Sequence, residues 1–203
     1  YRIVKHVATG GMGEVYKARH ALLKRPTAIK LLKKSIMSPE AVARFEREVQ
    51  LASLLAHPST IEIYDFGQTP EGTFYYAMEY LIGLTLRQLV IIEGAIRPAR
   101  VVYLLRQVCG SLREAHDMGQ VHRDISPNNI MLCRRGGMAD VAKVLDFGLA
   151  KPIQIPDGDQ ITGTGTLVGT PLYIAPERFR DPATADPRSD LYALGCVTYK
   201  LLT

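Results

Sequence analysis

The pattern of apolar residues along this chain changes once, near residue 82. Up to about residue 80, runs such as "EVYKARH", "TAIKLLK" and "TFYYAMEYL" read as β-strands, and turn sequences such as "TGGMG" separate them. From about residue 83 the pattern becomes mainly helical, with short strands after Gly119. A strand-rich part followed by a helix-rich part predicts an α+β protein with two parts, residues 1–82 and 83–203.

One helix is predicted within the strand-rich part, from Pro39 to Ala56. Ser38 suits its N-cap and Pro39 its first helical position. When this segment is wound at ~100° per residue, most of its apolar side chains fall on one arc, and Glu48 falls inside that arc. A carboxylate that points toward an apolar interior needs a partner, and Lys30 in the strand "TAIK" is the natural one.

The last stretch, "DLYALGCVTYKLLT", is apolar on nearly every side. Such a helix is normally buried in the middle of a domain. Here, however, no later residues of the sequence are left to cover it. We therefore expect the sequence to stop inside a domain, within this long helix.

Charge, cysteine content and hydropathy indicate which partners and which cellular compartment to expect for the chain. The 203 residues carry a net charge of +5, which alone is weak support for nucleic acid, so no nucleic-acid partner is expected. The three cysteines are far apart and form no CxxC motif, which indicates reduced thiols in a cytoplasmic compartment. No segment resembles a signal peptide or approaches the ~20 apolar residues that span a bilayer, so no membrane contact is expected within this segment.

The tripeptide Asp-Phe-Gly occurs twice, at 65–67 and at 146–148. The first copy ends a predicted strand and enters the turn "GQTPEG" without another motif beside it, so we interpret it as a hairpin end. The second copy follows "VHRDISPNNIML" and precedes "GTPLYIAPE". These neighbours place Asp124, Asn129 and Asp146 in nearby loops, and carboxylate and amide oxygens are the ligands that Mg²⁺ prefers.

This ordered set of motifs resembles that of the eukaryotic-type protein kinases. The stretches "GGMGEVYKA" and "GTPLYIAPE" look most like the bacterial serine/threonine branch, and the resemblance runs from Tyr1 to Thr203. It implies a bilobal fold, with an antiparallel-sheet N-lobe containing one helix (1–82) and a mainly helical C-lobe (83–203) that is incomplete here. It also implies a serine/threonine kinase that uses ATP and Mg²⁺ and has proteins as substrates.

The resemblance assigns roles to particular residues. Asp124 accepts or orients the proton of the attacking hydroxyl, Lys30 holds the α and β phosphates, and Asn129 completes the catalytic set. Asn129 and Asp146 are the implied Mg²⁺ ligands. The implied nucleotide-binding residues are Val7, Ala8, Gly10, Gly11, Gly13, Val15, Ala28, Lys30, Glu48, Met78, Glu79, Leu81 and Asp146.

Two positions depart from the family pattern. Ala8 replaces the first glycine of the glycine loop, and because a methyl group restricts φ we expect weaker ATP binding. Ser126 replaces the lysine that usually follows the catalytic aspartate by two residues, and the lost charge is expected to slow transfer. These departures keep open the alternative of a pseudokinase, a nucleotide-binding or scaffolding module. A small-molecule phosphotransferase is a third reading, disfavoured because such enzymes commonly lack a "GTPxYxAPE" segment.

The segment from Asp146 to Glu177 matches the activation segment of the family. Thr162 and Thr164 have the spacing of regulatory phosphothreonines, and Arg123 is the implied partner of such a phosphate. We therefore predict autophosphorylation there, with a transient homodimer for that reaction; the alternative is a flexible Gly/Thr loop without regulation. Asp190 matches a buried aspartate that tethers the catalytic loop.

Overall fold

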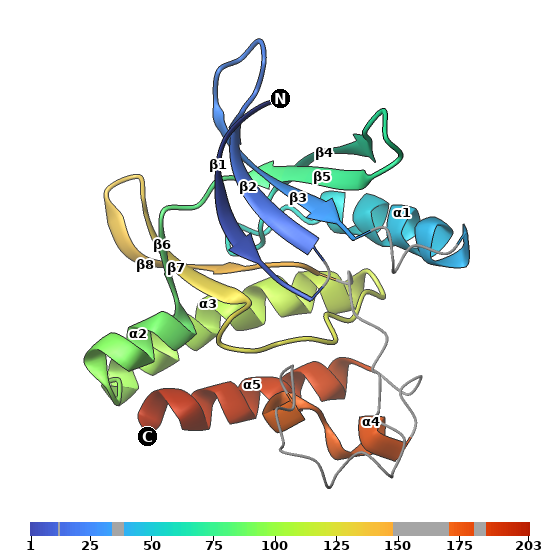
Figure 1. Cartoon of the computed structure of the whole chain (residues 1–203). Helices are drawn as coiled ribbons and strands as arrows, with labels where there is room; N and C mark the ends of the chain where they lie inside the picture. Colours follow the sequence, from blue (N-terminus) through green and yellow to red (C-terminus); the bar gives the residue numbers. More distant parts are fainter. Residues whose placement is uncertain (12, 34–38, 148–170, 181–185) are drawn as a thin grey trace, which may run out of the picture. The chain divides into compact units, whose positions relative to one another are not determined.

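The computed structural model describes residues 1–11, 13–33, 39–147, 171–180 and 186–203. These residues form two compact units, Tyr1–Ile82 and Gly83–Thr203 (Figure 1). The first unit is an antiparallel sheet with one helix, whereas the second is mainly helical with a small sheet. The predicted α+β class is confirmed.

Five antiparallel strands in the order β1-β2-β3-β5-β4 make the sheet of the first unit. Their bounds are β1 (Arg2–Thr9), β2 (Gly13–Arg19), β3 (Pro26–Leu32), β4 (Ile63–Gln68) and β5 (Phe74–Glu79). The strand predicted over "TIEIYDF" begins only at Ile63, because the preceding residues form a turn in which the Thr60 N–H donates to the His57 carbonyl oxygen at 2.8 Å. The first Asp-Phe-Gly lies within β4, which confirms its interpretation as part of a hairpin.

The two faces of this sheet have different coverings. A buried cluster of Ala18, Ile29 and Ala77 lies on one face. Helix α1 (Pro39–Ser53) packs on the other, where the Phe45 ring lies 6.1 Å from that of Tyr76 and 6.3 Å from that of Phe74. The buried side chains of α1 include Phe45, Val49 and Ala52, which all belong to the predicted apolar arc.

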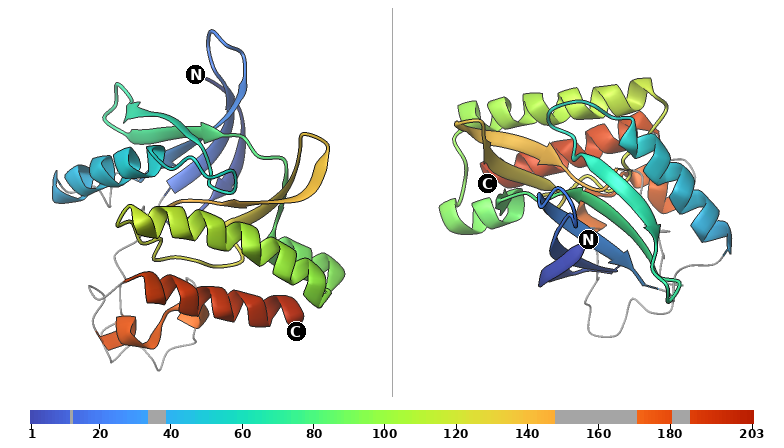
Figure 2. Two further views of the ribbon diagram at one scale, coloured as in Figure 1. Left: turned by 180° about the vertical axis from the view of Figure 1, so that it is seen from behind. Right: turned by 90° about the horizontal axis from the view of Figure 1, so that it is seen from above.

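In its described residues, the second unit consists of four helices, a 3₁₀ turn and a three-stranded sheet. The elements are β6 (Gly83–Thr85), α2 (Leu86–Glu93), α3 (Pro98–Asp117), β7 (Ile130–Arg135), β8 (Met138–Val144), a 3₁₀ turn η2 (Pro171–Tyr173), α4 (Pro176–Arg180) and α5 (Pro187–Leu202). Helix α3 packs against β8 and α5 (Figure 2). Its ends match the sequence signals, since Pro98 opens the helix and Gly119, with φ of 73°, follows its end.

A charged network fixes α3 to the β7–β8 hairpin. Arg100 of α3 binds both carboxylate oxygens of Asp140 at 2.8 Å and also binds Glu93 of α2 at 2.7 Å. The Arg100 guanidinium, through this hydrogen bonding, holds the pKa of Asp140 below its usual value. About two turns further along α3, the Gln107 side chain donates to the Asp140 carbonyl oxygen and accepts from the Ala142 N–H. The small sheet is thereby held at a defined position on α3.

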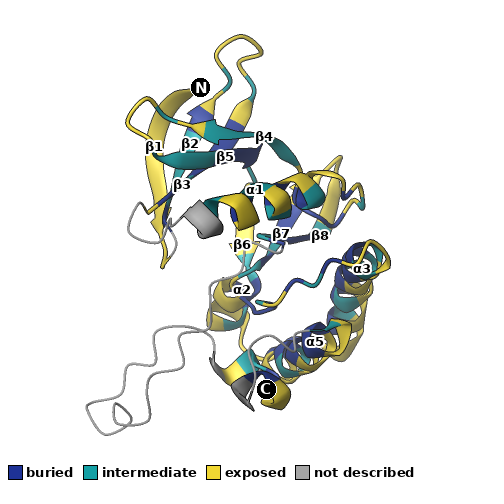
Figure 3. Ribbon diagram, turned by 90° about the vertical axis from the view of Figure 1, so that its right-hand side faces the viewer, coloured by how far each residue is buried: buried dark blue, intermediate teal, exposed yellow. Residues whose placement is uncertain are grey.

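Helix α5 is buried on one face only. The buried residues are Ser189, Asp190, Ala193, Leu194, Val197 and Leu201. In contrast, Leu191, Tyr192 and Tyr199 are exposed, as the yellow parts of α5 in Figure 3 indicate. Among the described residues, α2, α3 and η2 pack on this helix, and its other face is left uncovered, as expected from the sequence.

None of the helices in the described ranges is both long enough and apolar enough to cross a membrane.

Candidate active site

The loop between α3 and β7 brings Asp124 and Asn129 into direct contact. The Asn129 side-chain N–H groups donate to the carbonyl oxygen of Asp124 at 2.8 Å and to its carboxylate at 2.9 Å. The backbone N–H of Asn129 donates to the Ser126 carbonyl oxygen at 3.0 Å, which closes the loop. Because these bonds use the amide N–H groups, Oδ1 is the atom through which Asn129 can bind a cation.

Asp146 follows β8 directly and lies next to this loop. The Leu145 N–H donates to the Asn129 carbonyl oxygen at 2.8 Å, so the two segments are bonded to each other. Asp146 has a φ of 55°, a left-handed conformation that residues other than glycine seldom adopt and that is often found at functional sites. Asp146 is half-buried, and its carboxylate and the amide oxygen of Asn129 are both ligand types that suit Mg²⁺, whose remaining ligands are usually phosphate and water oxygens.

His122 forms the buried centre of this loop. Its Nδ1 accepts from the Asp124 N–H at 3.2 Å, and its Nε2 lies 2.7 Å from the Leu145 carbonyl oxygen. These partners require a neutral ring with the proton on Nε2. The Phe147 ring, 2% exposed, packs against the imidazole with 4.8 Å between centroids. His122 therefore joins the Asp124 loop to the segment that carries Asp146.

Asp190 of α5 holds the same loop from the other side. Its two carboxylate oxygens accept the N–H groups of His122 and Arg123, both at 2.8 Å, and its side chain is 1% exposed. The predicted tether is thereby confirmed. Arg123, like Asp146, is left-handed, with a φ of 69°. His116 of α3 also binds Asp190, at 2.8 Å.

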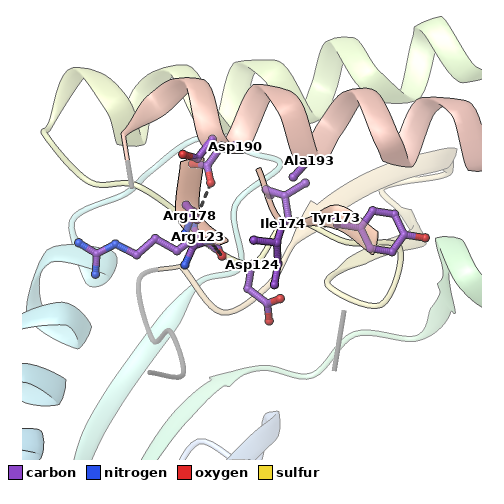
Figure 4. Close-up of a pocket in the computed structure, with 9 residues that line it drawn as sticks. Arg123, Asp124, Tyr173, Ile174, Arg178, Asp190 and Ala193 are labelled. Atoms are coloured by element: carbon purple, nitrogen blue, oxygen red, sulfur yellow. Dashed lines mark hydrogen bonds between the residues drawn. The ribbon is translucent and has the colours of Figure 1, made fainter. Parts of the chain in front are cut away.

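A small pocket lies beside the catalytic loop (Figure 4). It is lined by Arg123, Asp124, Ile125, Tyr173, Ile174, Arg178, Ser189, Asp190 and Ala193. Burial lowers the pKa of Arg178, although the Asp190 carboxylate opposes that shift, and burial raises the pKa of Tyr173. The pocket therefore combines a predicted site residue, Asp124, with charged residues from α4 and α5.

Sequence reasoning missed two residues of this group, His116 and Arg178. His116 occupies the last turn of an amphipathic helix, and its partner Asp190 lies 74 residues further along the chain. Arg178 follows "APE" directly, where the charge alone predicts an exposed side chain. Neither contact leaves a local pattern in the sequence, because each depends on segments that meet only in the folded chain.

In the first unit, the strand register places several predicted nucleotide-binding residues on one face of the sheet. Directly opposed residues of antiparallel strands share a face. The register pairs Ala8 with Val15, Val15 with Lys30, Lys30 with Tyr76, and Ala28 with Met78. Because Tyr76 packs against Phe45, this is the face that α1 covers.

Lys30 is among the buried charged residues of this unit, with 9% of its side chain exposed. Its Nζ lies 5.7 Å from the centre of the Tyr76 ring. Glu48 is half-buried on α1, one turn after Phe45, and therefore lies on the same side of the helix as Phe45. The structure thus places Lys30 and Glu48 on the two surfaces that face each other between β3 and α1.

The glycine loop joins β1 to β2. The Gly10 N–H donates to the Gly13 carbonyl oxygen at 2.8 Å, and Gly10 and Gly11 are exposed. At Gly13 a Cβ atom would lie 1.9 Å from the Leu31 carbonyl oxygen, so only glycine fits between the strands. Ala8 is not among the positive-φ residues of the described chain, so its backbone conformation does not require glycine, and the weaker ATP binding expected from its methyl group stays a prediction.

The remaining predicted nucleotide-binding residues lie at the edges of this sheet. Val7 is exposed at an irregularity in the β1–β2 register. Met78 and Glu79 are buried at the end of β5, and Leu81 follows in the connection to the second unit. The Glu79 N–H donates to the Glu62 carbonyl oxygen at 2.9 Å, and the Glu79 carboxylate accepts the Glu62 N–H at 3.0 Å.

Three further positions singled out in the sequence have different outcomes. Ser126 is 1% exposed and its buried Oγ finds no hydrogen-bond partner among the described residues, so the hydroxyl does not project into solvent. Thr162 and Thr164 lie outside the described residues.

Comparison with known proteins identifies the family of the chain. Residues 1–203 match the family model described as the protein kinase domain. The chain therefore belongs to the protein kinase family, whose members use ATP as phosphoryl donor, typically with Mg²⁺.

The relatives come from bacteria. Over its whole length the chain is 42% identical to serine/threonine-protein kinase pkn3 of Myxococcus xanthus and 39% identical to serine/threonine-protein kinase PknB of Mycobacterium tuberculosis. It spans 37% and 32% of the length of these curated relatives. The predicted resemblance to the bacterial serine/threonine branch is confirmed.

A solved structure gives the same answer for the fold. The crystal structure of the M. tuberculosis PknI kinase domain superimposes with a TM-score of 0.78 at 28% identity, covering 98% of this chain and 71% of that chain. The predicted protein-kinase fold is confirmed.

Proposed function

We propose that this chain is the catalytic part of a serine/threonine protein kinase that transfers the γ-phosphate of ATP to hydroxyl groups of protein substrates. One observation carries the proposal. The carboxylate of Asp124 is bonded to the amide of Asn129, and the same asparagine is bonded through its backbone to the residue before Asp146. Phosphoryl transfer demands such alignment of a base with metal ligands more than it demands covalent chemistry by the protein.

Each residue of this group has a defined task. Asp124, oriented by the two Asn129 bonds, accepts or directs the proton of the substrate hydroxyl. Asp146 and the Oδ1 atom of Asn129 hold Mg²⁺, which neutralises phosphate charge when it is bound. His122 and Asp190 keep the loop in place through the bonds described above.

The sheet face of the first unit supplies the nucleotide-binding surface. Val15, Ala28 and Met78 offer an apolar surface to the adenine ring, and the backbone of Glu79 and Leu81 offers hydrogen bonds to its edge. Lys30 binds the α and β phosphates and is held by Glu48. The glycine loop, with Val7, Ala8, Gly10, Gly11 and Gly13, closes over the phosphates, where small residues permit close approach.

Regulation follows the sequence prediction. Phosphate on Thr162 or Thr164 pairs with the exposed guanidinium of Arg123 and orders the segment. Two copies of the chain meet transiently for this reaction, and the catalytic part acts in the cytoplasm. No observation on the described residues favours a pseudokinase.

The test is turnover by the full-length protein with Mg-ATP, with phosphate mapped by mass spectrometry. Lys30→Met and Asp124→Asn are expected to lower the rate by about 10²- to 10⁴-fold, the range for loss of a positioned acid or base. Lys33→Met is the matched control, because Lys33 is exposed three residues after Lys30. A folded protein that binds ADP but transfers no phosphate would establish the pseudokinase instead.

A further inference from the structure

Arg178 is a charged side chain buried in the second unit, with only 6% exposed. Arg178 lies on α4, and its backbone N–H donates to the carbonyl oxygen of Ala175 at 3.0 Å. Arginine is almost never fully buried unless its charge is paired. Here burial lowers the pKa of Arg178, and the carboxylates of Asp190, Asp124 and Glu177 oppose that shift. The guanidinium therefore interacts electrostatically with the Asp124 carboxylate as well as with those of Asp190 and Glu177.

The hydrogen bond that Arg178 makes is specific to one peptide group. Its guanidinium NH1 donates to the carbonyl oxygen of Arg123. The N–H of the same peptide group, which belongs to Asp124, donates to His122 Nδ1 at 3.2 Å. The plane of the peptide between Arg123 and Asp124 is thus held at both ends, and this plane sets the direction in which Asp124 leaves the backbone.

The backbone at this point needs such support. Arg123 has a φ of 69°, which a non-glycine residue keeps only when its surroundings impose it. Asp190 binds the N–H of Arg123 at 2.8 Å, so the residue is held from α5 on one side and from α4 on the other. At the same time, within the part of the chain that the structure describes, the buried Nε of Arg178 has no hydrogen-bond partner. A side chain selected for stability alone would not bury an unpaired donor, so its value lies in the bond to Arg123.

We propose that Arg178 is a positioning residue for phosphoryl transfer: from α4 it fixes the peptide between Arg123 and Asp124 and thereby the direction of the Asp124 carboxylate. The inference rests on the proposed function. It also makes α4 part of the catalytic apparatus, since a displacement of this short helix reaches Asp124 through one guanidinium.

The experiment compares Arg178→Met and Arg178→Lys with the wild type in the full-length protein. Steady-state kinetics give kcat and KM for ATP, and calorimetric ADP binding gives the folded fraction and the nucleotide affinity. We expect Arg178→Met to lower kcat by about 10- to 100-fold, the size of effect that a small misplacement of a catalytic group produces. The ADP affinity is expected to stay within about twofold of the wild-type value, because Arg178 is not one of the predicted nucleotide-binding residues. Arg178→Lys keeps a charged donor without the guanidinium geometry, so we expect a smaller loss of about 3- to 10-fold.

Arg188→Met is the matched control, because that side chain is 86% exposed on α5 and binds only Asp186 in the described contacts. It is expected to leave kcat within about twofold of the wild type. If Arg178→Met does not fold, Arg178→Lys decides alone, and wild-type kcat in that variant overturns the inference. Wild-type kcat in folded Arg178→Met also overturns the inference. So does a loss of activity in Arg178→Met that only matches the loss of folded protein. An inactive wild type, in contrast, refutes the proposed function itself.

Discussion

Removal of the Asp190 carboxylate is the sharpest test of how the catalytic loop is held. This carboxylate accepts the backbone N–H groups of His122 and Arg123 while it is 1% exposed. Asp190→Ala leaves two buried donors without acceptors, at about 1–3 kcal/mol each, so we expect a loss of about 2–6 kcal/mol in the free energy of unfolding. Asp190→Asn keeps one acceptor and is expected to lose about half as much, on the order of 1–3 kcal/mol.

Two measurements on the full-length protein check this expectation. Urea unfolding of the kinase region gives the change in free energy, and hydrogen exchange reports the amides of His122 and Arg123 individually. Asp186→Asn is the control, since Asp186 caps the same helix through the Arg188 N–H at 2.7 Å and is worth about 1 kcal/mol. The reasoning is refuted if Asp190→Ala costs no more than the control, or if the two amides exchange as slowly as in the wild type.

Three further predictions concern other parts of the chain. Arg100 lowers the pKa of Asp140, so Asp140→Asn should lower the free energy of unfolding by about 1 kcal/mol at neutral pH. Because the pKa of Asp140 is depressed in the folded state, this stabilisation is present above pH ~4 and is lost as the pH falls through the folded-state pKa. Unfolding curves recorded against pH will show this loss. Gly13→Ala should destabilise the first unit strongly, since its Cβ would lie 1.9 Å from a backbone carbonyl of β3, whereas Gly10→Ala meets nothing closer than 3.9 Å and should leave the thermal midpoint nearly unchanged. Ser126→Ala should cost less than about 0.5 kcal/mol, or even stabilise, because the buried hydroxyl has no partner to lose, and a clear drop in the thermal midpoint would contradict this.

Local patterns predicted the parts of the fold that local physics controls. Glycine turns and strand-like runs located the strands, and the apolar arc through Phe45 and Val49 predicted the face of α1 that packs on the sheet. The first Asp-Phe-Gly was assigned to a hairpin because no other functional motif lies beside it. These features depend on neighbouring residues in the sequence and are therefore visible without a structure.

Contacts between distant segments could not be predicted in the same way. The partners of Asp190 come from α3 and from the catalytic loop, and the bond from Arg178 to Arg123 spans 55 residues. The apolar pattern of α5 indicated that the helix needs cover on most sides, but which of its faces the neighbouring elements cover depends on contacts between distant segments. The conformation of Ala8 could not be predicted either: it lies in β1 and is not a positive-φ residue, which the glycine pattern of the loop does not reveal.

The pair of bonds from Asn129 to Asp124 limits which amino acid can occupy position 129. The side chain there donates on one edge to a carboxylate and a carbonyl, and it presents an oxygen on its other edge. Aspartate has the same shape but no donor, so it would set two carboxylates against each other. Glutamine carries the same amide one methylene further out, beyond the loop that the Asn129 backbone closes on Ser126. Position 129 therefore needs a side chain that donates on one edge, accepts on the other and is as short as asparagine.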